Sequence, residues 1–333
     1  MNVLDQMIAC IKHKHVFIQT HNFPDPDAIA SAFGLQQLFA QKGIESTICY
    51  KGRIDRSSSA RMVEELSIRI VELEEMEDMK EDAEIVLVDS QKGNANTIDL
   101  PGSEILCVDH HPTFEKAEYE YSDIRPEVGA CASIIASYYF ENEIEMDVRV
   151  ATALIYGIKV DTANLTRGVS DLDLTMFYQI YHKANMDLIK RLEMNVLKMQ
   201  DLNAYARAIS TIRICGRICF ANTGANCPEP LIASISDFML ALDEISMSVV
   251  YSLKADGIKI SVRRANIRLN AGKITNEALR GIGNGGGHEN MAGGFIPYRF
   301  EPALPLDQRK EKLNDLFNQI QKRFLDTMPG IEN

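Results

Sequence analysis

Three short apolar segments of this 333-residue chain each end beside carboxylate or imidazole side chains. The segments are residues 16–18, 85–88 and 105–108. Apolar runs of this length predict buried strands, and in open α/β sheets ligand sites collect at the carboxyl ends of the strands. We therefore expect one shared site, with the candidate residues His21, Asp25, Asp27, Asp89, Asp109, His110, His111 and Asp161.

The types of these side chains restrict the metal and the reaction. Carboxylate and imidazole ligands without a thiolate favour Mn²⁺, Mg²⁺, Co²⁺ or Fe²⁺ over structural zinc. Asp25 and Asp27 flank Pro26, and alternate residues of an extended segment point to two neighbouring places, which favours two ions. Two ions roughly 4 Å apart activate a water and stabilise the charge on an attacked phosphate. The pattern predicts a metal-dependent phosphoester hydrolase.

Each residue also has a plainer interpretation when it is taken alone. An Asp that follows a strand commonly caps a helix or a turn, so Asp89 and Asp161 could be caps. The triplet of residues 109–111 is less ordinary, because its two adjacent histidines point to different sides and suit one ligand and one catalytic role. The coincidence at four places in the chain favours a site over four unrelated caps.

Strand and helix signals alternate over the first half of the chain. This alternation predicts an α/β fold, a mostly parallel sheet flanked by helices on both faces. Residues 171–208 have helical periodicity without Pro or Gly, and we place a linker there. The β-rich remainder, with a hairpin turn at residues 255–257, predicts a smaller second α/β domain. The expected parts are a catalytic domain at 1–185, a helical linker at 186–208 and a substrate-binding domain at 209–333.

Composition excludes several classes of function. The net charge of −12 argues against binding long duplex nucleic acid, whereas a short anionic substrate stays compatible because two divalent cations would reverse the local charge. No apolar stretch reaches the roughly 18 residues that a membrane span needs, and the N-terminus lacks the charge order of a signal peptide. Seven cysteines without metal-type spacing are typical of reduced core residues. We expect a cytoplasmic protein that does not bind membranes.

A glycine-rich segment, residues 281–295, could bind substrate. Glycines alone are weak evidence, because they also serve turns and close packing. A run of three glycines, 285–287, directly precedes His288, and bare backbone N–H groups with an imidazole could bind a phosphate or base. Arg263 and Arg264 are adjacent in a predicted strand and face opposite ways, so only one should reach the site; we favour Arg263.

These motifs together resemble one family over essentially the whole chain. They are HNFPDPDA, VLVDS, VDHH, VGACAS, GIKVDT, ISVRR and GGGHENMAGG. The chain resembles standalone members of the DHH phosphoesterase superfamily that carry a DHHA1-type C-terminal domain. The resemblance implies an active site in the cleft between the two domains, and a homodimer.

The resemblance also implies roles for single residues. One Mn²⁺ would be held by His21, Asp25 and Asp89, and the second by Asp27, Asp89, His110 and Asp161. Mg²⁺ or Co²⁺ could take the place of Mn²⁺. Asp109 would orient His110 without binding metal, and His111 would contact the scissile phosphate and assist the leaving group. The implied substrate-binding residues are Arg263, Gly285, Gly286, Gly287 and His288.

Among the members of this superfamily, the motifs favour nano-RNases (oligoribonucleases), pAp phosphatases and soluble phosphodiesterases. We expect a Mn²⁺-dependent phosphodiesterase that cuts short oligonucleotides and linear dinucleotides such as pApA and pGpG to 5′-mononucleotides, with pAp phosphatase activity as a second reaction. Two alternatives stay open: a phosphodiesterase of cyclic di-AMP or cyclic GMP-AMP, and a catalytically weak nucleotide-binding regulator. Residues 163–168 depart from the Gly-Phe/Arg-Phe pattern of nano-RNases, so substrate preference should depend on this loop.

Overall fold

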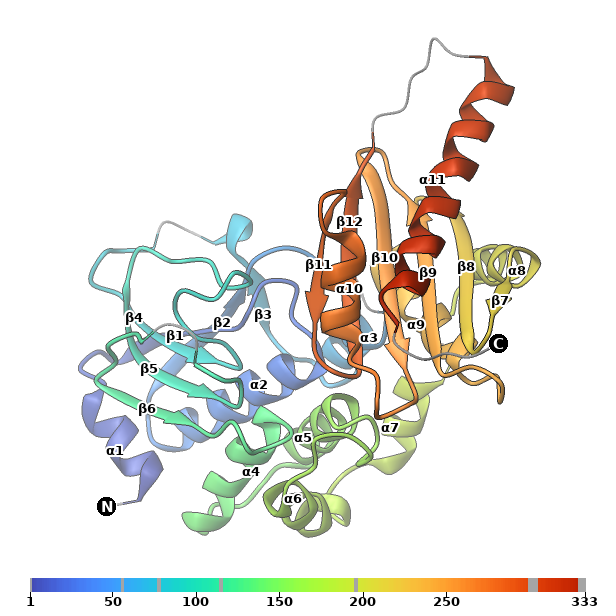
Figure 1. The fold of residues 1–333 in the computed structure, drawn as a ribbon. Coiled ribbons are helices and arrows are strands. Elements are labelled where there is room, and N and C mark those ends of the chain that lie inside the picture. Colours follow the sequence, from blue (N-terminus) through green and yellow to red (C-terminus); the bar gives the residue numbers. More distant parts are fainter. Residues whose placement is uncertain are drawn as a thin grey trace. The chain divides into compact units, whose positions relative to one another are not determined.

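The computed structural model describes residues 2–54, 57–76, 79–113, 116–194, 197–298 and 305–328. The chain forms two compact units, Met1–Val196 and Leu197–Asn333, and the boundary falls within the predicted linker (Figure 1). Within the described ranges, no helix has both the length and the apolar character that crossing a bilayer requires.

Unit 1 contains a six-stranded sheet in which every neighbouring pair is parallel. The strands are β1 (His15–Gln19), β2 (Glu45–Tyr50), β3 (Ile70–Glu72), β4 (Glu84–Val88), β5 (Ser103–Asp109) and β6 (Tyr121–Ile124). Their order is β3-β2-β1-β4-β5-β6, so the direction of the chain across the sheet reverses between β1 and β4. The predicted parallel sheet is confirmed. Open α/β sheets bind ligands at such a reversal of strand order.

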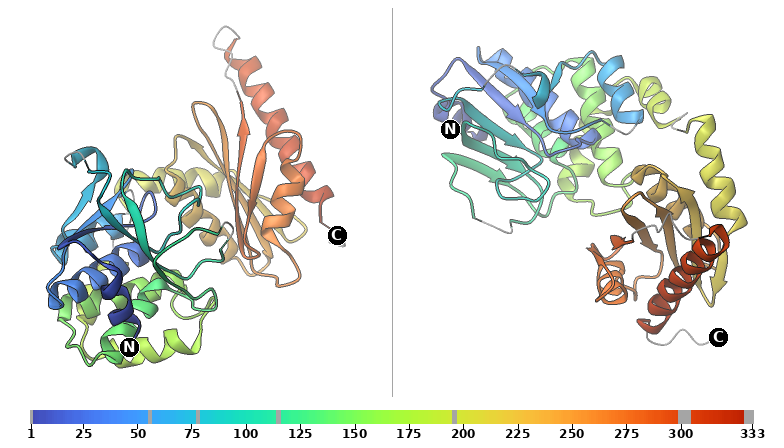
Figure 2. Two further views of the ribbon diagram at one scale, coloured as in Figure 1. Left: turned by 90° about the vertical axis from the view of Figure 1, so that its left-hand side faces the viewer. Right: turned by 90° about the horizontal axis from the view of Figure 1, so that it is seen from above.

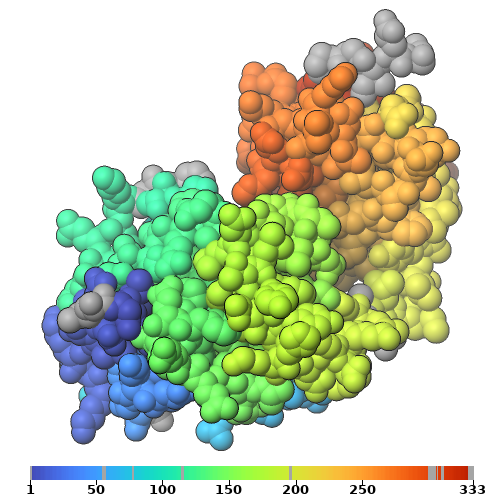
Figure 3. Space-filling model, turned by 90° about the horizontal axis from the view of Figure 1, so that it is seen from below, coloured from blue at the N-terminus to red at the C-terminus, as the bar shows by residue number. Residues whose placement is uncertain are grey.

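The helices of unit 1 pack on one face of this sheet. They are α1 (Val3–Cys10), α2 (Pro26–Gln41), α3 (Ser57–Glu65), α4 (Cys131–Glu141), α5 (Val148–Asp161), α6 (Asp171–Tyr181) and α7 (Met186–Glu193). Val16 and Ile18 of β1 belong to the core cluster that these helices form, whereas Ile85, Leu87 and Cys107 form a separate cluster on the other face. Figure 3 views the side on which α4 to α7, drawn in green to yellow-green, cover unit 1.

The expectation of helices on both faces is therefore wrong for unit 1. Parallel strands are joined by right-handed crossovers, so the reversal at β1/β4 sends the connections β4–β5 and β5–β6 over the second face. In the described residues of these connections, 89–102 and 110–120, no helix forms. Leu100 and Tyr119, which are partly buried residues of these connections, pack against the cluster that contains Leu87 instead. Figure 2 draws the described parts of the two connections, in teal to green, as loops.

The predicted helical stretch 171–208 is broken into separate helices. After α6 and α7 come a 3-10 turn (η2, Met199–Asp201) and α8 (Leu202–Ser210). The Asn185 side chain accepts a hydrogen bond from the backbone N–H of Leu188 and so begins α7. Side chains that bond to nearby backbone compete with helix continuation, which periodicity alone does not reveal.

Unit 2 contains a mixed six-stranded sheet, in the order β11-β12-β10-β9-β8-β7. Its remaining elements are β7 (Arg213–Cys215), β8 (Ile218–Ala225), α9 (Glu229–Leu240), β9 (Met247–Leu253), β10 (Gly257–Arg264), α10 (Ala271–Leu279), β11 (Asn284–Gly287), β12 (Met291–Pro297) and α11 (Leu306–Asp326). β8 and β9 are parallel, and the other pairs are antiparallel. The hairpin predicted at residues 255–257 joins β9 and β10, and the smaller second α/β domain is confirmed.

Candidate metal centre

The segment between β1 and α2 carries the first predicted ligands. Asp25 is the N-cap of α2, and its Oδ1 accepts hydrogen bonds from the backbone N–H groups of Asp27 (3.0 Å) and Ala28 (3.2 Å). His21 Nδ1 donates to the carbonyl of Asn22 (2.9 Å). Because a carbonyl only accepts, this bond assigns Nε2 of His21 as the atom that faces the site. That atom lies 3.9 Å from Asp25 Oδ1.

Asp89 follows β4, on the other side of the reversal in strand order. Its backbone is left-handed, with φ of 56°, a conformation that Asp tolerates better than most residues. The side chain is only 3% exposed, and its Oδ1 has no hydrogen-bond partner. Asp89 Oδ2 lies 3.7 Å from His21 Nε2, and Oδ1 lies 3.3 Å from His110 Nε2. The Asp89 carboxylate thus lies between two imidazole rings.

His110 begins the second group of ligand candidates. Its Nδ1 donates to the carbonyl of Val128 (3.1 Å), so Nε2 faces the site. This nitrogen lies 3.3 Å from Asp161 Oδ2 and 3.9 Å from Asp27 Oδ2. Asp161 is the last residue of α5. Among the described residues, three groups have possible ligand atoms that all lie within 4.8 Å of one another. Two contain the predicted ligands, namely His21, Asp25, Asp89 and Asp27, His110, Asp161, and the third is Asp89, Asp109, His110, His111.

Asp27 is held by the start of α4. Its carboxylate is 1% exposed and accepts hydrogen bonds from the backbone N–H groups of Cys131 (2.7 Å) and Ala132 (2.9 Å). These are orphan donors of the first helical turn, where the helix dipole favours a negative charge. Asp27 therefore joins α2, α4 and the candidate metal centre.

The protonation of these groups tests whether the residues fit a cation. Burial lowers the pKa of both imidazoles, but the neighbouring carboxylates outweigh it and raise the pKa of His21 to about 9 and of His110 to about 11. Burial and mutual repulsion raise the pKa of Asp161 to about 6 and that of Asp27 well above its ordinary value. Without a cation, these groups keep their protons. A bound metal ion would supply the positive charge in place of those protons. With the unpartnered oxygen of Asp89 and the all-N/O donor set, they fit divalent Mn²⁺, Mg²⁺ or Co²⁺.

His111 and Asp109 form a hydrogen-bonded pair beside the two groups. His111 Nδ1 donates to Asp109 Oδ1 (2.9 Å), and the same oxygen accepts from the backbone N–H of His110 (2.8 Å). Asp109 therefore orients the ring of His111, whereas its bond from His110 comes from the backbone N–H; orientation of His110 by Asp109 stays a prediction. The hydrogen bond to Asp109 raises the pKa of His111. Burial alone would raise the pKa of Asp109, but the hydrogen bond from His111 outweighs burial and lowers the pKa of Asp109 below its ordinary value. A half-exposed imidazole held by a buried carboxylate is suited to proton transfer.

Gln91 bonds to both members of the His111–Asp109 pair. The sequence patterns did not identify Gln91 as a site residue. Its Nε2 donates to Asp109 Oδ2 (2.7 Å) and to the carbonyl of His111 (2.9 Å). The only local signal is its place two residues after Asp89, at the end of a predicted strand.

The glycine-rich segment lies in unit 2 and is partly a strand. Gly285 and Gly286 pair with Gly294 and Gly293 of β12, so this part of the segment is an extended strand. Glycines in strands allow close approach of other backbone, and α10 packs against this strand. β11 is the edge of its sheet, and an edge strand presents unpaired N–H and C=O groups. Binding of substrate by residues 285–288 stays a prediction.

The two arginines of β10 face opposite ways, as expected. Arg263 Nε donates to Asp237 Oδ1 of α9 (2.9 Å). Arg264 Nε donates to the carbonyl of Glu289 (2.8 Å), which follows the glycine-rich strand. The role of Arg263 in binding substrate stays a prediction, and any such role must compete with Asp237.

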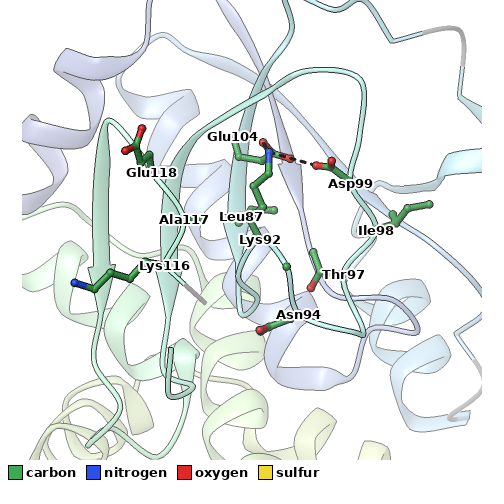
Figure 4. A pocket seen from close by; sticks show the side chains of 11 residues that line it. Leu87, Lys92, Asn94, Thr97, Ile98, Asp99, Glu104, Lys116, Ala117 and Glu118 are labelled. Atoms are coloured by element: carbon green, nitrogen blue, oxygen red, sulfur yellow. Dashed lines mark hydrogen bonds and ion pairs between the residues drawn. The ribbon is translucent and has the colours of Figure 1, made fainter. Parts of the chain in front are cut away.

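A cavity of about 520 Å³ lies elsewhere in unit 1 (Figure 4). Its lining includes Leu87, Thr97 and an ion pair in which Lys92 Nζ lies 2.7 Å from Glu104 Oε2. None of the predicted site residues lines this cavity. The cavity is therefore separate from the candidate metal centre.

Comparison with known families covers both units. Residues 15–158 match the DHH family N-terminal domain, and residues 216–324 match the DHHA1 domain. The chain belongs to the DHH/DHHA1 phosphoesterase superfamily. Its DHH domain contains all the ligand candidates except Asp161, which lies three residues beyond the matched range, and its DHHA1 domain contains the glycine-rich strand.

Individual relatives differ in how much of the chain they match. An uncharacterized protein of Methanocaldococcus jannaschii is 33% identical over 95% of this chain and 65% of its own length. A probable manganese-dependent inorganic pyrophosphatase of Streptococcus thermophilus is 29% identical over 44% of this chain and 48% of its own length. A probable bifunctional oligoribonuclease and PAP phosphatase of Streptococcus mutans is 26% identical over 49% of this chain and 50% of its own length. The chain thus spans between about half and 65% of these relatives.

A solved structure extends the likeness over both domains. The exopolyphosphatase-related protein of Bacteroides fragilis covers 97% of this chain and of its own, with a TM-score of 0.72 and 15% identity. At that identity the likeness concerns the DHH/DHHA1 fold alone.

Proposed function

We propose that this protein is a Mn²⁺-dependent phosphodiesterase that hydrolyses short oligonucleotides and linear dinucleotides, such as pApA and pGpG, to 5′-mononucleotides. One observation carries the proposal: the buried Asp89 carboxylate, with an unpartnered oxygen, lies between two imidazole–carboxylate groups and beside the His111–Asp109 pair. The likeness to an oligoribonuclease and PAP phosphatase supports the substrate class, and the name of the pyrophosphatase supports manganese.

Metal binding and proton transfer are assigned to different residues. The two groups that meet at Asp89 would hold two divalent ions, which supply activation of water and positive charge for the attacked phosphoryl group. His111 donates a proton to the 3′-oxygen as the bond between phosphorus and that oxygen breaks, so the products are a free 3′-hydroxyl and a 5′-phosphate. Asp109 holds the ring through Nδ1, which leaves Nε2 to transfer the proton.

The DHHA1 domain favours a nucleotide substrate over inorganic pyrophosphate. The likenesses to the pyrophosphatase and to the oligoribonuclease cover similar shares of the chain, 44% and 49%, so the choice between the two substrates rests on the DHHA1 match at residues 216–324. The edge strand β11 and His288 offer donors that could recognise a base or phosphate. We also propose, from the family resemblance, that the protein is a homodimer.

The first test is product analysis with Mn²⁺ on pApA, pGpG, pAp, cyclic di-AMP, cyclic GMP-AMP, pyrophosphate and a 10-mer. We expect fast release of mononucleotides from the linear dinucleotides and loss of this activity in a folded His111→Ala variant. Preference for a cyclic dinucleotide or for pyrophosphate would overturn the proposed substrate class. Nucleotide binding without turnover of any substrate would favour the regulator instead.

Removal of metal gives a second prediction. Protein treated with a chelator and desalted should lose activity, and Mn²⁺ should restore it. Ligand binding to the folded state should also raise the free energy of unfolding by about 2.7 kcal/mol when free Mn²⁺ is 100 times its dissociation constant. Urea titrations with and without Mn²⁺ measure this. Full activity of the metal-free protein would contradict the proposal.

Arg167 is expected to bind a substrate phosphate. It follows a turn in which Ala163, Asn164 and Leu165 all have positive φ, of 48°, 58° and 61°. Its Nη2 donates to the carbonyl of Asp161 (2.7 Å), which holds the guanidinium close to the candidate metal centre. A guanidinium offers five donors in a fork that matches phosphate oxygens, so further donors are left for substrate.

The Arg167→Ala variant should therefore raise KM for pApA by about 10- to 100-fold, the equivalent of one charged hydrogen bond. We expect kcat to stay within about threefold if this contact is equally strong in the transition state. Steady-state kinetics separate the two constants, and Arg167→Lys, which keeps the charge but not the fork, should have an intermediate KM. An unchanged KM in Arg167→Ala would exclude this contact.

A further inference from the structure

Gln91 closes a hydrogen-bonded ring around the candidate proton donor. The residue is 2% exposed, and its Nε2 donates to both Asp109 Oδ2 (2.7 Å) and the His111 carbonyl (2.9 Å). Asp109 uses its other oxygen, Oδ1, to accept from His111 Nδ1 and from the backbone N–H of His110. Both donors of the Gln91 amide and both oxygens of Asp109 are therefore engaged.

These bonds restrict a ring that is otherwise weakly held. The side chain of His111 is 44% exposed, whereas that of Asp109 is fully buried. A carboxylate bound through one oxygen can turn about its terminal torsion, which is broad for Asp. Gln91 binds the second oxygen and thereby keeps Oδ1 directed at the imidazole. Its second bond holds the backbone of His111 itself.

We propose that Gln91 is a positioning residue, which holds the Asp109–His111 pair in the orientation that delivers a proton to the leaving oxygen. This inference rests on the proposed function, since it assigns the proton transfer to His111. The Gln91 side chain bonds to Asp109 and to the backbone of His111. Both residues also belong, with Asp89 and His110, to a third group that could hold a metal ion, so the test includes a measurement of Mn²⁺ affinity. A positioned general acid typically contributes about 10²- to 10⁴-fold to a rate, and part of this contribution depends on its orientation.

The test compares two substrates that differ in their need for a proton. Cleavage of pApA expels an alkoxide, which requires protonation, whereas the p-nitrophenyl ester of thymidine 5′-monophosphate expels nitrophenolate, which is stable without it. Gln91→Met keeps the length of the side chain and removes its donors. We expect its kcat on pApA to fall by about 10- to 100-fold, and its kcat on the nitrophenyl ester to stay within about twofold of the parent.

Three further variants keep the outcome interpretable. Gln91→Ala removes the same donors without crowding the core and should reproduce the result if Gln91→Met folds poorly. Gln36→Met is the matched control, because Gln36 Nε2 also donates to a carbonyl, that of Ser46 (2.9 Å), outside the site. His111→Ala in the same assays tests the proposed function, and it should have the same leaving-group dependence, to a larger extent.

The outcomes distinguish a positioning role of Gln91 from a purely structural role and from a role in metal binding. Equal losses of kcat on both substrates, or no loss on pApA, would overturn the positioning role of Gln91. If His111→Ala lacks leaving-group dependence, the proposed proton transfer itself fails. Mn²⁺ affinity, measured by calorimetry, should be unchanged in Gln91→Met, and a drop of tenfold or more would assign Gln91 to the metal site instead.

Discussion

Asp89→Asn is expected to lower kcat on short oligonucleotides by about 10³-fold, because several kcal/mol of transition-state stabilisation depend on bound metal and each 1.36 kcal/mol is tenfold in rate. Asp89 Oδ2 lies 3.7 Å from His21 Nε2 and Asp89 Oδ1 lies 3.3 Å from His110 Nε2, so its carboxylate lies between an imidazole of each candidate group. Asn keeps the shape of the side chain and tolerates the positive φ of this position. The substitution therefore changes the charge of the centre and little else.

The stability of the same variant distinguishes a metal ligand from a structural residue. Asp89 lies near two imidazoles that it attracts, and it repels the carboxylates of Asp27 and Asp161. These opposing effects should leave the melting temperature of the metal-free variant close to that of the parent. We expect the rise in melting temperature that Mn²⁺ causes in the parent to be lost in Asp89→Asn.

Calorimetric melting with and without Mn²⁺, together with kinetics on pApA, checks this prediction. Asp99→Asn is a suitable control, because Asp99 is exposed and forms an ion pair with Lys92 (3.4 Å) outside the centre. A Mn²⁺-dependent rise in Asp89→Asn as large as that of the parent would remove Asp89 from the ligands.

Asp173→Ala is expected to lower the free energy of unfolding of unit 1 by about 3–5 kcal/mol, the cost typical of removing one partner from a buried charged network. The carboxylate of Asp173, on α6, is fully buried. It accepts four hydrogen bonds, from Gly129 N (2.8 Å), Ser133 Oγ (2.5 Å), Ser170 N (2.7 Å) and Ser170 Oγ (2.6 Å). Alanine would leave the buried hydroxyl of Ser133 and the partly buried donors of Gly129 and Ser170 without this partner.

The effect should extend from α6 to the metal centre. Gly129 follows Val128, whose carbonyl holds the ring of His110, and α4 then begins at Cys131, whose N–H holds Asp27. Loosening this segment should weaken Mn²⁺ binding by about 10- to 100-fold, as other losses of ligand support do.

Urea denaturation and Mn²⁺ calorimetry measure the two effects. Asp171→Ala is the matched control, since Asp171 occupies the same first turn of α6 but is exposed. Its loss should cost no more than about 1 kcal/mol, through the helix dipole. A stability of Asp173→Ala equal to that of Asp171→Ala would contradict the proposed support.

The sequence by itself determined the parallel sheet and the residues that meet at its carboxyl edge. Short apolar runs ending at Asp89 and at Asp109 were sufficient, because strand periodicity and the geometry of parallel sheets are local or general rules. The structure brings His21, from the segment between β1 and α2, to the same place.

Tertiary structure alone decided which partner each side chain takes. The bond from His111 to Asp109, the bonds from Gln91, the pairing of Arg263 with Asp237 and the strand at residues 284–287 join positions whose relative orientation no local pattern specifies. Tertiary structure also decided that helices cover one face of the first sheet. Crossover handedness determines the face, and the described residues of the connections over the other face form no helix. Hydrogen-bond direction and sheet pairing depend on how distant segments pack, and packing is a property of the folded chain.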